Sequence, residues 1–197
     1  MSLALVVFAV TIVVSLAALS RDSKLQQRLA FRPYWLVRRG QWHTLITHGF
    51  VHADLAHLAF NMITFWFFAF QLERVLGGVR FALLYFIALA ASEIGPYQKH
   101  RDDANYATLG ASGAITAVLF ASIVYFPASR LLVFPIPIPI PAPLFAVLYL
   151  VFSAYADRQQ LGHVNHGAHI GGALTGLVFV ALVDPRAYSQ MLRTVLA

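Results

Sequence analysis

Four polar residues in an otherwise apolar chain have the types that acyl-transfer chemistry requires. Ser112 lies in a Gly-Ala-Ser-Gly turn at residues 110–113, and His169 lies at the start of another apolar segment. A histidine within hydrogen-bond reach of a serine hydroxyl is the general base of a minimal activated nucleophile. His57 and Asn61, spaced i, i+4, would project from one helix face and could donate hydrogen bonds to an oxyanion. The four residues together indicate a serine protease site.

The composition places this site in a membrane. Of 197 residues, 59% are hydrophobic and 11% are charged, whereas globular domains have about 25% charged residues. A membrane span needs about 20 mostly apolar residues. Six runs lack charged residues: 1–20, 55–72, 81–92, 104–129, 131–156 and 159–183. We therefore expect an all-α membrane protein, a bundle of six transmembrane helices that forms a single domain over residues 1–197 with no separate soluble domain.

The connections between these runs also carry signals. Residues 21–53 mix aromatic and basic side chains in the way typical of a membrane interface. Asp54 is expected to cap the helix that follows. Residues 98–105 are predicted to be a polar loop. The alternating prolines of residues 135–143 cannot form a helix, so we expect an extended entry to the fifth span. Residues 1–20 have no basic residue before the apolar stretch, which favours an uncleaved span over a signal peptide.

Small residues predict how the two candidate catalytic residues could meet. Taken alone, Ser112 fits a helix-packing position and His169 fits a membrane interface. Gly172 and Gly176, however, stand four apart, and Gly113 opens a similar small-residue stripe in the fourth span. Such stripes let two membrane helices touch backbone to backbone. If these two stripes pack, the starts of the fourth and sixth spans lie close together.

The turn around Ser112 fits a nucleophile as well. A serine at a helix start lies near free N–H groups and the positive end of the helix dipole, which stabilise a developing oxyanion. Gly110 and Gly113 would let the backbone bend and let another chain approach.

Other chemistries fit the sequence less well. None of the eight acidic residues lies in the core of the fourth or sixth span, so the site would be a Ser-His dyad. The eight histidines could cluster as His48, His52 and His57 or as His163, His166 and His169. The chain has neither a cysteine nor a His-Glu-x-x-His motif. We therefore expect no metal and no cofactor. The formal charge of +6 is scattered between spans, which favours membrane lipids over nucleic acid as partners.

Three sequence motifs resemble those of the rhomboid intramembrane serine proteases, and they follow one another along the chain in the family's order. The segment from His48 through His57 to Asn61 resembles the family's His-x-x-x-Asn region, and residues 110–113 resemble its Gly-x-Ser-Gly motif. Residues 168–176 resemble its Ala-His-x-x-Gly-x-x-x-Gly motif. The resemblance covers nearly the whole chain.

The resemblance implies a water-filled cavity in a six-helix bundle that cuts transmembrane substrate proteins within or beside the bilayer. Ser112 would be the nucleophile and His169 the base, and His57 and Asn61 would hold the oxyanion with the N–H groups of Ser112 and Ala111. Glu73, with the following Gly77, would close the second span. The residues expected to support the structure are Gly110, Gly113, Glu73, Gly77, Gly172 and Gly176. The fifth span would act as a substrate gate, and the expected location is a prokaryotic cytoplasmic membrane.

Two positions depart from the family pattern. Trp42-His43 stands where relatives usually have Trp-Arg, and Thr116 stands where an aromatic residue often stacks beneath the base. Tyr149 or Tyr155 could replace that aromatic ring.

The distribution of charge also conflicts with the family. The segments that connect spans one and two, three and four, and five and six carry nine Lys or Arg residues in total. The segments on the opposite side of the membrane carry five. The positive-inside rule would place the side with nine basic residues in the cytoplasm, whereas the resemblance implies that both termini lie there. We follow the resemblance, because the rule concerns short loops and the first connection is long. Two other functions remain open: a non-catalytic rhomboid-like protein that binds membrane helices, and a small transporter or channel.

Overall fold

The computed structural model describes residues 1–21, 23–133, 136–162 and 164–196 and is mainly helical over them. The helices in chain order are α1 (Leu3–Arg21), α2 (Ser23–Leu29), α3 (Pro33–Arg38), α4 (Thr44–Thr47), the 3₁₀ turn η1 (His48–Phe50), α5 (Leu55–Leu76), α6 (Gly78–Ser92), α7 (Ile94–His100), α8 (Ser112–Tyr125), α9 (Ala142–Gln159), α10 (His166–Val183) and α11 (Arg186–Leu196). Strands β1 (Arg130–Val133) and β2 (Ile136–Pro141) pair antiparallel.

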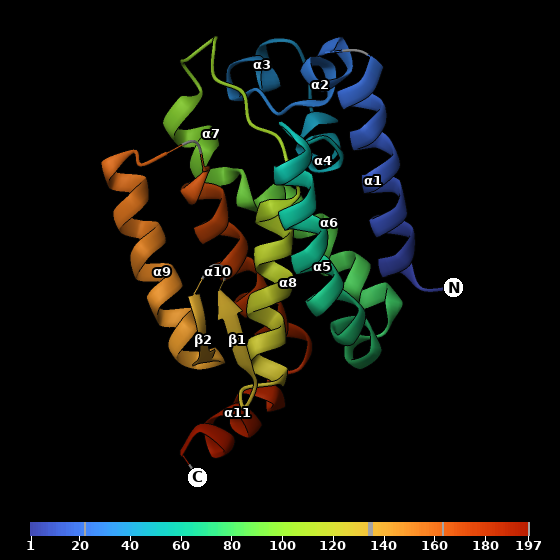
Figure 1. The fold of residues 1–197 in the computed structure, drawn as a ribbon. Coiled ribbons are helices and arrows are strands. Elements are labelled where there is room, and N and C mark those ends of the chain that lie inside the picture. Colours follow the sequence, from blue (N-terminus) through green and yellow to red (C-terminus); the bar gives the residue numbers. More distant parts are fainter. Residues whose placement is uncertain (22, 134–135, 163, 197) are drawn as a thin grey trace.

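The long helices form a bundle around α8, which confirms the fold class expected from the sequence. Helices α5, α6 and α10 pack against α8, while α1 lies outside α5 and α6, and α9 lies outside α10 (Figure 1). Every residue of α8 from Gly113 to Val124 is buried. The short helices α2, α3 and α4 gather at one end of the bundle, and α11 lies at the other (Figure 1).

Three helical segments of the described chain are long and apolar enough to cross a membrane. They are Leu55–Leu76, Gly78–His100, which joins α6 to α7 through Glu93, and His166–Val183. Two further apolar helices, Leu3–Leu19 and Ser112–Tyr125, are shorter. The chain is therefore an integral membrane protein with a helical bundle.

One boundary differs from the sequence prediction and two follow it. Helix α7 occupies part of the region predicted to be a polar loop at residues 98–105. Helix α8 starts at Ser112, directly after the glycine-serine turn, as expected for a serine at a helix start. The helix of the fifth span begins at Ala142, after the prolines that hold the chain extended, as predicted.

The proline tract forms one strand of a hairpin. Residues 136–141 are extended, as predicted, and Pro135 lies outside the described residues. Arg130 pairs with Pro141 and Leu131 with Ile140. Neither this hairpin nor helix α11 was predicted from the sequence.

Capping residues mark both ends of α5. The Asp54 carboxylate accepts a hydrogen bond from His57 N at 2.7 Å, which confirms the predicted cap. At the other end, Gly77 ends the helix with φ +79°. Just before it, the Glu73 carboxylate accepts hydrogen bonds from Leu3 N at 2.6 Å and from Ser2 Oγ. Glu73 therefore joins the end of α5 to the start of α1.

Candidate active site

Helices α8 and α10 touch backbone to backbone beside Ser112 and His169. A Cβ added at Gly172 would lie 2.0 Å from Gly113 O, and one added at Gly176 would lie 2.2 Å from Ala117 O. No side chain larger than hydrogen fits at either position. The contact predicted from the two small-residue stripes is thus confirmed, and it brings the starts of α8 and α10 together.

Ser112 is the first residue of α8 and is partly exposed. The N–H groups of a helix's first turn have no partners within the helix, so this end of α8 presents donors around the serine. Within the described residues, the Ser112 hydroxyl forms no hydrogen bond with His169. The two residues are linked instead through a short polar chain that starts at the Ser112 carbonyl oxygen, to which Thr116 Oγ1 donates at 2.8 Å.

Tyr149 of α9 completes that chain and holds the imidazole of His169. Tyr149 Oη lies 2.9 Å from His169 Nδ1 and 3.4 Å from Thr116 Oγ1. The rings of Tyr149 and His169 are stacked, with centroids 6.2 Å apart. Tyr155, the alternative that the sequence left open, is 57% exposed. Tyr149 therefore supplies the aromatic ring beside His169 that Thr116 lacks. Its hydroxyl contacts Nδ1 rather than Nε2.

His57 lies against the turn that precedes Ser112. Gly110 has φ +114°, in the region that favours glycine, and a Cβ there would lie 2.6 Å from His57 Cε1 and 2.8 Å from its Nε2. One turn along α5, Asn61 is buried and its Nδ2 donates to His57 O at 2.9 Å. An amide nitrogen carries two hydrogens, so a second donor of Asn61 remains.

The Ala111 amide is engaged, in contrast to the role that the resemblance implied. Ala111 N donates to His52 Nε2 at 3.4 Å. Burial lowers the pKa of His52 to about 3, so its ring is neutral. Ser15 Oγ donates to Phe50 O at 2.9 Å and accepts from His52 Nδ1 at 2.8 Å, which leaves Nε2 as the acceptor. The Ala111 N–H is therefore not free for an oxyanion in this arrangement, whereas the Ser112 N–H has no hydrogen-bond acceptor among the described residues.

His52 is a site residue that the sequence analysis weighed only as a metal ligand. The ring is fully buried and meets His57 edge-on, with centroids 4.9 Å apart. The only sequence signal is its position five residues before His57, within the motif region. Its partner Ser15 lies in α1, 37 residues away, and no local pattern connects the two.

His48 fastens the first connection to the bundle. His48 Nε2 lies 3.4 Å from Glu93 Oε1, and both side chains are buried. The His48 carbonyl oxygen accepts from Gly110 N at 2.9 Å, so the same residue also holds the turn before Ser112. No group of three His, Asp or Glu side chains in the described part of the chain is arranged to hold a metal ion.

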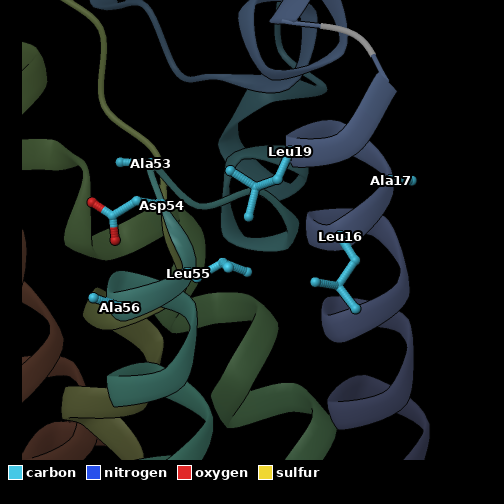
Figure 2. Close-up of a pocket in the computed structure, with 7 residues that line it drawn as sticks. All are labelled: Leu16, Ala17, Leu19, Ala53, Asp54, Leu55 and Ala56. Atoms are coloured by element: carbon cyan, nitrogen blue, oxygen red, sulfur yellow. The ribbon is translucent and has the colours of Figure 1, made fainter.

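Two cavities lie near this region. An open one of about 940 Å³ separates α1 from the start of α5, and Leu16, Leu19 and Leu55 extend into it (Figure 2). A polar one of about 310 Å³ is bounded by the end of α7 and by the segment that joins α9 to α10. Its lining includes His166, whose ring lies 6.0 Å from that of His169.

Most of the chain is similar in sequence to known proteins. The Rhomboid domain family model matches residues 39–186. Rhomboid protease GluP of Bacillus subtilis (strain 168) is 30% identical over 153 residues, which are 77% of this chain and 28% of the relative. RHOMBOID-like protein 12, mitochondrial, of Arabidopsis thaliana is 31% identical over 161 residues, covering 72% and 46%. The human presenilin-associated rhomboid-like protein, mitochondrial, is 32% identical over 139 residues, covering 69% and 36%. The chain spans less than half the length of these relatives.

Proposed function

The chain belongs to the rhomboid family, and on that premise we propose that it is an intramembrane serine endopeptidase that cleaves transmembrane proteins within or near the bilayer. The observation that carries the proposal is the contact of Gly172 with the Gly113 carbonyl. This contact supports a Ser112–His169 dyad, because each of the two residues lies within three positions of it.

In the proposed reaction, His169 Nε2 takes the Ser112 hydroxyl proton while Oγ attacks the scissile carbonyl carbon. A hydrogen bond between Ser112 Oγ and His169 forms once substrate is bound, since such bonds are often long without substrate. The tetrahedral oxyanion is held by the His57 ring, the free Asn61 hydrogen and the Ser112 N–H.

The tetrahedral intermediate then collapses and the C–N bond breaks. His169 returns its proton to the leaving amine, and the new amino terminus departs. Water, drawn from the polar cavity beside His166, attacks the acyl ester with His169 again as base. The acid product leaves and the Ser112 hydroxyl is restored. No step needs a metal or a cofactor.

The proposed partners are transmembrane substrate proteins and the surrounding lipids. Helix α9 fits a substrate gate, because its only wholly buried residues are Ala142, Ser153 and Ala156 in the described chain. The proposed location is a prokaryotic cytoplasmic membrane, supported by the Bacillus subtilis relative.

A fluorophosphonate probe tests the proposal directly. The purified full chain should be labelled, and Ser112→Ala should abolish the labelling. His169→Ala should slow it by about 100-fold or more, because the base is lost. Ser122→Ala is the matched control, since this buried α8 hydroxyl donates to Val118 O, within its own helix, and its loss should not affect labelling.

Equal labelling of the wild type and Ser112→Ala would refute the serine nucleophile. A wild-type chain that is folded but never labelled would favour a non-catalytic member of the family. Ion or solute flux in liposomes that persists in Ser112→Ala would favour a transporter.

A further inference from the structure

Helix α11 is amphipathic, and the rest of the bundle covers only part of its apolar face. At about 100° per residue, its apolar side chains fall on one half of the helix surface and its polar ones on the other. The apolar half consists of Ala187, Tyr188, Met191, Leu192, Val195 and Leu196. A helix with two such distinct faces needs an apolar environment along the whole of one side.

Only part of the apolar half contacts the protein. Ala187 is buried in the main core, and Tyr188 and Met191 pack against that core. Tyr188 Oη donates to Leu177 O at 2.7 Å, which anchors α11 to α10. The remaining apolar side chains are exposed: Leu192 by 54%, Val195 by 49% and Leu196 by 83%.

The location of α11 indicates what covers these side chains. Only Asp184 and Pro185 separate it from α10, which is long and apolar enough to span a membrane. The start of α11 therefore lies at the membrane surface. Leu182, one residue before the end of α10, is 78% exposed, so the exposed apolar surface of the spanning helix extends to its end.

The polar half carries charge of one sign. Arg186 and Arg193 lie on it, and α11 contains no acidic residue. Strand β1 starts at the same end of the molecule as α11 (Figure 1), and its first residue, Arg130, adds an exposed basic side chain. The nearby Asp184 carboxylate accepts from Tyr125 Oη at 3.2 Å.

We propose that α11 is a lipid-binding interfacial helix that lies on a leaflet rich in anionic phospholipids. Leu192, Val195 and Leu196 enter the acyl chains, while Arg186 and Arg193 bind phospholipid phosphates. A helix in this position gains free energy from apolar burial and from attraction to anionic lipids. The site is separate from Ser112 and His169 and does not depend on proteolysis.

The absence of cysteine from the chain makes a direct test possible. Leu192→Cys and Gln190→Cys place a single fluorescent label on the apolar and polar halves of the same helix turn. Each full-length variant is reconstituted in vesicles of phosphatidylcholine, alone or mixed with phosphatidylglycerol. Quenching by aqueous iodide and by doxyl-labelled lipid then reports the depth of each label.

The Leu192 label should be quenched by doxyl lipid and should be about threefold or more better shielded from iodide than the Gln190 label. Phosphatidylglycerol should increase that shielding, and Arg186→Gln with Arg193→Gln should remove the increase. Equal iodide quenching of the two labels in both lipids would overturn the interfacial position. An increase that survives loss of both arginines would overturn the anionic-lipid contact. Unchanged gel-filtration profiles show that the labelled variants are folded.

Discussion

Tyr149 Oη determines which nitrogen of His169 is left for the proposed proton transfer. Because Oη lies 2.9 Å from Nδ1, Nε2 is the nitrogen that can serve Ser112. A hydrogen bond of this kind orients the ring, a role that carboxylates fill in catalytic triads. Here a phenol from the neighbouring helix fills it.

Tyr149→Phe should lower kcat for cleavage of a transmembrane substrate by about fivefold to tenfold, because one hydrogen bond of about 1 kcal/mol is lost. KM should change little, since the ring and its packing remain. Separate kcat and KM values from initial rates in detergent test this. Tyr155→Phe is the matched control on the same helix and should leave both constants unchanged. An unaffected kcat in Tyr149→Phe would show that the phenol does not orient His169.

At this scale the sequence predicted residue identities better than contacts. The replacement of an aromatic residue by Thr116 could be seen from the motif, and two tyrosines were proposed to compensate. Only tertiary packing distinguishes them, because both lie in one helix and their exposure depends on what that helix faces. The hydrogen bond from the Ala111 amide to His52 also depends on tertiary packing and was missed. Ser15, the other partner of His52, lies in α1.

Among the elements, the contact between α8 and α10 has the least room for change. Gly172 meets the Gly113 carbonyl, and Gly176 meets the Ala117 carbonyl one turn further on. Any side chain at either glycine would force two backbones apart. The two helices can lie this close only because the side chain at each glycine is a single hydrogen atom. The distance between Ser112 and His169 depends on this separation.

Gly172→Ala should reduce the rate of fluorophosphonate labelling by about 100-fold, because a displacement of about 1 Å at a reacting group has an effect of this size. Its thermal unfolding temperature should also fall, since overpacking at a helix contact destabilises the fold. Gly95→Ala is the control, because a Cβ there would meet nothing closer than Gly167 O at 4.0 Å. Wild-type labelling by Gly172→Ala would contradict the close contact.

The sequence predicted the spanning helices more reliably than the segments that connect them. The small-residue spacing was sufficient to predict the α8–α10 contact, because the geometry of helix packing is local and periodic. The start of α8 at Ser112 also followed from the glycine-serine turn. The contacts that hold residues 104–111 as a loop did not, because they come from distant segments, such as His48 O, which accepts from Gly110 N. The hairpin was missed because extended pairing of the proline tract depends on residues 130–133.

At the scale of the whole molecule, polar groups tie α1 to the rest of the bundle at both ends. Near its start, α1 donates to Glu73, and near its end, Ser15 bonds to His52. Helix α1 is therefore coupled to the turn that carries Ser112, although it supplies none of the proposed catalytic residues.

Glu73→Gln should lower the free energy of unfolding by about 1–3 kcal/mol, because a charged acceptor of several hydrogen bonds is weakened. Unfolding by sodium dodecyl sulfate, followed by circular dichroism, measures this. Asp103→Asn is the control: this exposed loop carboxylate accepts from the nearby Asn105 N, and its loss should change stability by less than about 0.5 kcal/mol. Equal effects of the two substitutions would argue against the α1 tether.

The burial of α8 on all sides has a consequence for how the protein is made. Its 14 residues extend over about 21 Å, short of the roughly 30 Å of a bilayer core, and protein rather than lipid surrounds them. Helix α10, which carries His169, is synthesised after α8. Until it arrives, a nascent chain holds Ser112 without His169. The order of synthesis thus keeps the proposed protease inert until α10 has entered the membrane.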